Sequence, residues 1–163
     1  MTGVQTCALP ISAKKKAGSK RQAARKAPAA RRAAPKATKK VIGGPIVVNG
    51  NQIPISKGIR IGDFVYLSGQ VPFKDGVPMT TGTIEEQTDV TMEMIKGLLK
   101  EAGASLSDVF KVTVWLRDKA DFLGYNRTYA KYFPKDPPAR STVMSTLMVD
   151  VRIEIEVTAY APR

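Results

Sequence analysis

An abrupt change in composition near residue 41 confines the globular part of this 163-residue chain to residues 41–163. Residues 1–40 contain 12 of the 26 Lys and Arg residues and no Asp or Glu, so residues 41–163 hold 14 basic and 14 acidic residues. The net charge of +12 therefore comes entirely from the first 40 residues. Residues 41–163 are long enough to bury one hydrophobic core, and association between copies would add to its stability.

Two stretches lie before this domain. Residues 1–12 match a translated sequencing adapter, and we interpret them as a scar to be kept out of fold reasoning. A genuine short leader is the alternative. Residues 13–40 are rich in Lys, Arg, Ala and Pro and bury too little apolar surface to offset the entropy of folding, so we predict disorder. Three roles fit such a tail: a plain linker, an organelle presequence, or nonspecific nucleic-acid binding through counterion release.

The residue inventory excludes several kinds of chemistry. The chain has no histidine and a single cysteine, Cys7. This rules out Ser-His-Asp triads, Cys-His pairs and imidazole bases, and zinc sites are built mainly from Cys and His. One cysteine cannot form an internal disulfide, which fits a reducing compartment. Because the chain has so few Cys and His residues, we expect no metal site. No apolar run approaches the roughly 20 residues that span a bilayer, so we expect no membrane span.

The best-defined predicted element begins near residue 83. Thr83-Ile84-Glu85-Glu86 forms a capping box, in which the Thr83 hydroxyl accepts from the Glu86 amide while the Glu86 side chain reaches back. Gly103 is a typical residue just beyond a helix C-terminus. The sequence therefore predicts a helix between these signals. Its core-facing stripe is Thr91, Ile95, Leu98, Leu99 and Ala102.

Other elements follow from periodicity and composition. Helical spacing returns over 121–133, with Phe122, Tyr125, Tyr129 and Tyr132 along one side, and we predict that this stripe is core rather than a ligand platform. The resulting order β-β-β-α-β-α-β-β predicts an α+β domain with two helices on one face of a mixed sheet. Five of these six strands are predicted in the runs 45–48, 64–68, 109–116, 139–147 and 152–160.

Two patterns suggest the binding and hydrolysis of a small acid. Arg140 follows two prolines that fix the backbone, and a rigidly held guanidinium suits bidentate recognition of a carboxylate. Alternation along 152–160 places Glu154 and Glu156 on the face opposite Ile153 and Ile155. The residues alone leave open two alternatives that involve no functional site. Arg140 could form an ordinary surface ion pair, and the glutamates could line a solvated face.

In combination and order, several motifs resemble the reactive-intermediate deaminase (Rid, YjgF) family. The resemblance covers about residues 45–161 and depends on the whole set. The motifs are Gly62-Asp63, Leu67-Ser68-Gly69-Gln70-Val71-Pro72, Gln87-Thr88, Val112-Thr113-Val114-Trp115-Leu116, Asn126 with Tyr129 and Phe133, Pro138-Ala139-Arg140-Ser141 and Ile153-Glu154-Ile155-Glu156.

This resemblance implies a chorismate-mutase-like fold (βββαβαββ) and a barrel-like homotrimer with clefts between subunits. It also implies cofactor-free hydrolysis, in the cytoplasm, of 2-imino acids or enamine tautomers such as 2-aminoacrylate to 2-keto acids and ammonia. Arg140 would bind the substrate carboxylate, and Glu154 would position the attacking water. The residues implied to line or support the cleft are Ser68, Gly69, Asn126 and Thr142.

The chain departs from the family pattern at two places. Ile55 replaces a tyrosine common near the start of the family domain. The run from Arg140 to Leu147 is one residue shorter than in well-known members, with Met148 in place of a proline, and a one-residue change reverses the faces of a strand. An alternative function is therefore a non-catalytic module that binds small carboxylates or a protein, which residues 13–40 could tether to nucleic acid. The neutral domain itself is not expected to bind nucleic acid.

Overall fold

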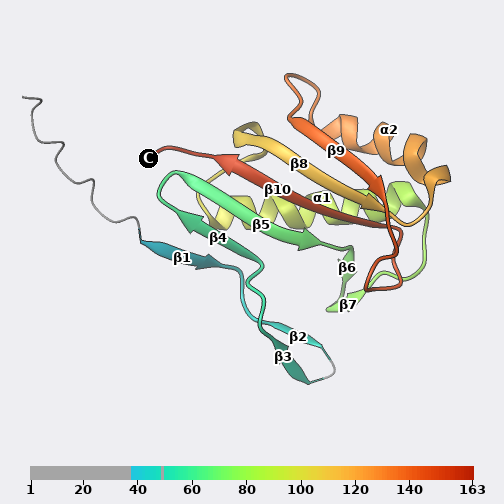
Figure 1. Ribbon diagram of the computed structural model, residues 1–163, viewed down its shortest axis with the longest axis horizontal. Coiled ribbons are helices and arrows are strands. Elements are labelled where there is room, and N and C mark those ends of the chain that lie inside the picture. The colour runs from blue at the N-terminus through green and yellow to red at the C-terminus, as the bar shows by residue number, and fades with distance from the viewer. Residues whose placement is uncertain (1–37, 49) are drawn as a thin grey trace, which may run out of the picture. The chain divides into compact units, whose positions relative to one another are not determined.

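The computed structural model describes residues 38–48 and 50–163 (Figure 1). The scar predicted at 1–12 and most of the tail predicted at 13–40 lie outside the described residues. The elements in chain order are β1 (Lys39–Ile42), β2 (Ile46–Val48), β3 (Asn51–Ile53), β4 (Gly58–Ile61), β5 (Phe64–Gln70), β6 (Phe73–Lys74), β7 (Val77–Pro78), α1 (Ile84–Glu101), the 3-10 turn η1 (Leu106–Asp108), β8 (Val109–Leu116), the 3-10 turn η2 (Lys119–Asp121), α2 (Phe122–Tyr132), β9 (Ala139–Met144) and β10 (Ile153–Tyr160).

Six strands form the main sheet in the order β1-β4-β5-β10-β8-β9. Neighbouring strands are antiparallel except β8 and β9, which are parallel and are joined through α2, the kind of crossover that parallel strands require. Both helices lie on the same side of this sheet (Figure 1). Strands of the main sheet and helices follow one another as β-β-β-α-β-α-β-β. The predicted α+β class, with two helices and a mixed sheet, is confirmed.

Helix α1 begins and ends where its local signals predict. The Thr83 Oγ1 accepts from the Glu86 amide at 3.2 Å, and the Glu86 Oε2 accepts from the Thr83 amide at 2.8 Å, so both halves of the capping box are present. Gly103 adopts a left-handed φ of 72° just beyond the helix, which glycine does without strain. Among the described residues, no helix is long and apolar enough to cross a membrane.

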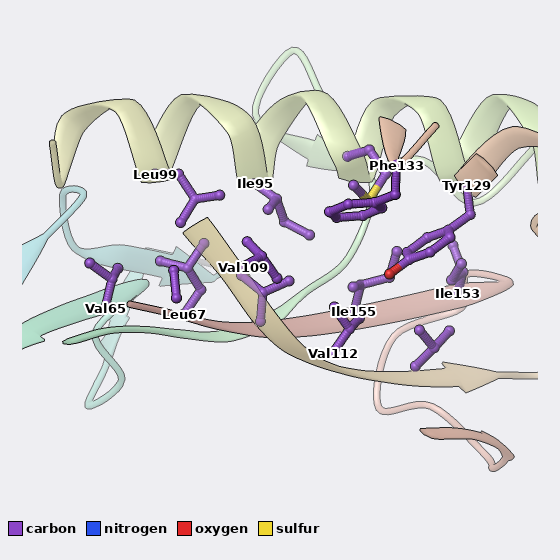
Figure 2. Packing of buried hydrophobic residues seen from close by; sticks show 14 of the residues in the cluster. Val65, Leu67, Ile95, Leu99, Val109, Val112, Tyr129, Phe133, Ile153 and Ile155 are labelled. Carbon is purple, nitrogen blue, oxygen red and sulfur yellow. The ribbon is translucent and has the colours of Figure 1, made fainter. Parts of the chain in front are cut away.

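The hydrophobic core fills the space between the helices and one face of the sheet. Figure 2 shows Ile95 and Leu99 of α1 packed toward side chains from the sheet below them. Each such apolar side chain contributes about 1.5–3 kcal/mol when fully buried. Within residues 38–48 and 50–163, the opposite face of the sheet carries no helix (Figure 1). The strand residues labelled in Figure 2 that face this core are Val65, Leu67, Val109, Val112, Ile153 and Ile155.

Three predicted boundaries need correction. The main sheet begins with β1 at Lys39, so the predicted tail of residues 13–40 overlaps a strand by two residues. The run predicted at 45–48 forms β2, which pairs only with β3 and lies outside the main sheet. The strand predicted at 139–147 ends at Met144. Met144 pairs with Leu116, the last residue of β8, so the chain beyond it has no strand to join.

The aromatic stripe of α2 is only partly core. Tyr125 is fully buried and Tyr129 is 5% exposed, as predicted. Tyr132 is half-buried, and its hydroxyl donates to the Asp89 Oδ1 at 3.1 Å. Phe122 is 43% exposed because it faces a cavity beside the edge strand β9 rather than the core.

Candidate active site

Arg140 is held on three sides by residues of α2. Its Nη2 donates to the Asn126 Oδ1 at 2.6 Å. Its guanidinium carbon lies 4.9 Å from the ring centre of Tyr125 and 4.7 Å from that of Tyr129, within cation–π range. Arg140 is therefore not part of an ordinary surface ion pair.

The local sequence of α2 explains this arrangement. Tyr125 and Tyr129 are four residues apart and share one face of the helix, and Asn126 stands beside them. The Asn126 Nδ2 donates to the Phe122 carbonyl at 2.7 Å, which turns its Oδ1 toward Arg140. Two prolines, Pro137 and Pro138, restrict the backbone before β9 and help fix where Arg140 emerges.

Three residues near Arg140 in the fold carry buried hydroxyl groups. The Thr142 Oγ1 and the hydroxyls of Tyr125 and Tyr129 are buried with no hydrogen-bond partner among the described residues. Burial raises the pKa of Tyr129 to about 12 and also raises the pKa of Tyr125, so both phenols are neutral near pH 7. Neutral phenols leave the positive charge of Arg140 uncancelled. We call Asn126, Arg140 and Thr142 the arginine half-site.

Glu154 lies in a different environment, on the face of the sheet that carries no helix. It is half-buried on β10, opposite Trp115 of β8. Between Ile155 and Val157 the pairing with β5 shifts by one residue, which places a bulge at Ser68 and Gly69. The bulge brings the Gly69 backbone so close that a Cβ at this position would overlap the Glu154 carboxylate. Glycine is required here for close approach.

Two further contacts define this second cluster. The Ser68 Oγ donates to the Ser56 carbonyl at 2.7 Å, which ties β5 to the loop before β4. Burial, and then the negative charge of Glu156, raise the pKa of the Glu154 carboxyl above its usual value. We call Ser68, Gly69 and Glu154 the glutamate half-site.

The two half-sites lie on opposite faces of one sheet. Arg140 pairs with Val112, whose side chain belongs to the core on the helix side. Glu154 pairs with Trp115, and adjacent strand residues point to opposite faces, so Trp115 and Glu154 lie away from that core. A single chain therefore does not bring Arg140 and Glu154 into one cleft.

Ile55 is next in sequence to the residue that anchors the glutamate half-site. It is 51% exposed and directly precedes Ser56, whose carbonyl binds the Ser68 hydroxyl. An apolar side chain therefore occupies the place where the family pattern has a phenol.

Two contributors to the site were not identified from the sequence. Tyr125 and Tyr129 were assigned to the core alone, yet they also support Arg140. The available signal was their chemistry, because a buried tyrosine normally needs a partner for its hydroxyl and a phenylalanine would not. Across residues 38–48 and 50–163, no three His, Cys, Asp or Glu side chains lie close enough together to hold a metal ion.

Known proteins share both the sequence and the fold of the part that carries these half-sites. A sequence model of the family described as Endoribonuclease L-PSP matches residues 50–161. A RutC family protein of Pyrococcus abyssi is 46% identical over 109 residues, covering 66% of this chain and 86% of that protein. Reactive Intermediate Deaminase A, chloroplastic, of Arabidopsis thaliana is 39% identical over 112 residues, covering 65% of this chain and 58% of that protein. The crystal structure of yeast Mmf1 matches with a TM-score of 0.69 at 32% identity, covering 76% of this chain and 99% of that one.

Proposed function

This chain belongs to the endoribonuclease L-PSP family, the YjgF/Rid family that its motifs resemble, and we propose that it hydrolyses 2-imino acids and their enamine tautomers to 2-keto acids and ammonia. The observation that carries this proposal is the anchored guanidinium of Arg140, with Asn126 at one edge and tyrosine rings against its face. A guanidinium has five N–H donors, and the bond to Asn126 uses one of them. The others can bind both oxygens of a carboxylate.

We place the complete cleft between two chains. The arginine half-site of one protomer would meet the glutamate half-site of a neighbour, because the two lie on opposite faces of the sheet within one chain. A closed ring of identical chains repeats such a contact at every interface, and a homotrimer would have three clefts. The face of the sheet without a helix carries half-buried Thr113 and Trp115, which suits coverage by another subunit.

The chemistry requires little beyond positioning. The substrate carboxylate would bind Arg140, and Glu154 would hold a water against the imine carbon. Attack forms the C–O bond and breaks the C=N π bond, whose electrons go to the protonated imine nitrogen, while Glu154 takes a proton from the water. Glu154 then returns this proton to the amino nitrogen. The C–N bond breaks as the hydroxyl group loses its proton to Glu154 and forms the carbonyl, which releases ammonia and the keto acid. Holding the reactants in place supplies most of the acceleration, and proton transfer by a positioned carboxylate adds about 10²- to 10⁴-fold.

The description of the family model names an endoribonuclease, and RNA is therefore the competing substrate. Binding of RNA depends strongly on cationic side chains that neutralise phosphates. Residues 41–163 have equal numbers of basic and acidic residues, and the cationic group that the two half-sites present is a single anchored arginine. These observations favour a small carboxylate as the substrate.

Ammonia release from 2-aminoacrylate generated in situ tests the proposal. We expect the chain to release ammonia faster than both Arg140→Ala and a protein-free control. A rate no better than either control would exclude the catalytic function. Binding of keto acids without turnover would instead identify a non-catalytic carboxylate-binding module, the function that Ile55 in place of a tyrosine would favour.

The raised pKa of Glu154 makes a pH prediction. Glu154 must be ionised to take a proton, so kcat/KM should rise as pH rises through a pKa above the ordinary glutamate value. Glu156→Gln removes a neighbouring negative charge, so it should lower that pKa and move the acidic limb of the pH profile to lower pH. The pH dependence of kcat/KM for both proteins measures the shift. Glu93→Gln, on the exposed face of α1, is the control and should leave the profile in place; an unmoved profile in Glu156→Gln would contradict the prediction.

A further inference from the structure

A cavity of about 520 Å³ lies between the N-terminal turn of α2 and the end of β9. Its walls are mostly apolar. Lys119 is exposed at the rim, where its ammonium can reach water while its carbon chain covers apolar surface. Ligand sites in proteins are typically cavities of about 300–1,000 Å³ with apolar walls and a few placed polar groups. The main lining residues are Leu116, Phe122, Leu123, Thr142, Val143 and Met144.

This cavity shares two walls with the arginine half-site. On β9, Arg140 and Thr142 point to the same face, and Thr142 lines the cavity. On α2, Asn126 binds Arg140 through its Oδ1, while its Nδ2 donates to the carbonyl of Phe122, another lining residue. The cavity is therefore two residues along β9 from Arg140 and one helical turn along α2 from Asn126. A ligand whose carboxylate is bound by Arg140 would have this apolar cavity beside it.

An exposed apolar residue also lies close in sequence to the anchor of the glutamate half-site. Ile55 is 51% exposed and precedes Ser56, whose carbonyl accepts from the Ser68 hydroxyl. If a neighbouring protomer supplies this half-site, Ile55 would add apolar surface near the cleft.

We infer that this cavity binds the side chain of the substrate and that the preferred substrates are 2-imino acids with a branched or long aliphatic side chain. The inference deepens the proposed function and rests on it. A methyl group would leave most of the cavity unfilled, whereas an isobutyl group would bury its added carbons against Leu116, Phe122 and Leu123. Each methylene placed in an apolar pocket is worth about 10- to 200-fold in selectivity.

Rates of ammonia release from the imines of leucine and alanine test this inference. We expect kcat/KM to be at least about 10-fold higher for the leucine imine, which is a conservative value for three added carbons. Ala120 is small, exposed and lines the cavity, so Ala120→Phe should fill it. This variant should lose the preference, with kcat/KM for the leucine imine falling to about that for the alanine imine. Ala130→Phe, on the exposed side of α2 and away from the cavity, should keep both rates.

The outcomes separate this inference from the proposed function. Equal kcat/KM for the two imines, or a preference that survives in Ala120→Phe, would overturn the inference while the deaminase function stands. If neither imine is hydrolysed, binding of the product acids still tests whether the cavity binds the aliphatic side chain. Calorimetry should then show 4-methyl-2-oxopentanoate binding at least about 10-fold more tightly than pyruvate, and equal affinities would overturn the cavity assignment.

Discussion

Replacing Arg140 with lysine should lower kcat/KM for imine hydrolysis by about 100-fold or more, with most of the loss appearing as a higher KM. The guanidinium does three things that an ammonium cannot do at once: it donates to Asn126, it lies within cation–π range of both Tyr125 and Tyr129, and it offers a fork to both carboxylate oxygens. The carboxylate is bound in the ground state and in the transition state alike. Loss of the guanidinium therefore weakens substrate binding more than it slows the reaction of the bound substrate.

Arg127→Lys is the matched control for this variant. Arg127 also lies on α2, and its Nη2 pairs with the Glu85 Oε1 at 2.7 Å, but both side chains are exposed. Exposed ion pairs contribute about 0–1 kcal/mol, and among the described residues the Arg127 side chain donates to Glu85 rather than to a half-site residue. Steady-state kinetics of the two variants side by side measure the effect. Equal and small effects in both would show that Arg140 does not bind the substrate.

Replacing Glu154 with glutamine should give the opposite kinetic pattern. We expect kcat to fall by about 100-fold or more while KM stays within a few-fold, because a carboxamide cannot accept a proton from the attacking water. Glu156→Gln is the control, since Glu156 lies on the same face of β10 and pairs with Thr113, whereas the close approach to Gly69 is made by the Glu154 side chain. It should keep its maximal kcat. A large rise in KM in Glu154→Gln would instead place Glu154 in substrate binding.

The stability of Glu154→Gln checks that its loss of activity is chemical. The folded protein raises the pKa of Glu154, so the folded state holds its proton more tightly than the unfolded state does. Stability is therefore lost as pH rises from the unfolded pKa through the folded pKa, and the ionised carboxylate is a cost above that window. Glutamine has no such cost. Chemical unfolding at neutral pH should find the variant at least as stable as the wild type.

Local signals made much of the fold predictable. The capping box at Thr83 and Glu86 and the glycine at 103 fix α1 through contacts within a few residues, so no tertiary information was needed. The alternation along β10 predicted its two faces, because Ile153 and Ile155 have no other place to be buried. The end of β9 could not be predicted, since it depends on where β8 stops.

The resemblance proposes which residues form the candidate site but does not give their geometry. The motifs placed Ser68, Gly69, Asn126, Arg140, Thr142 and Glu154 at one site by resemblance. Which face of the sheet each residue occupies depends on strand register between segments far apart in sequence, and register carries no short-range signal at Arg140. The stacking of Arg140 on Tyr125 and Tyr129 likewise arises only when β9 packs beside α2.

The most direct test of a cleft shared between two chains is to mix two inactive variants. Arg140→Lys retains an intact glutamate half-site, and Glu154→Gln retains an intact arginine half-site. If chains redistribute at random after joint refolding, about a quarter of the clefts in an equal mixture should combine two intact halves, as expected for a cyclic assembly. The account predicts that the mixture recovers about a quarter of wild-type ammonia release. A mixture in which differently tagged chains co-purify, yet activity stays at the level of the separate variants, would contradict it.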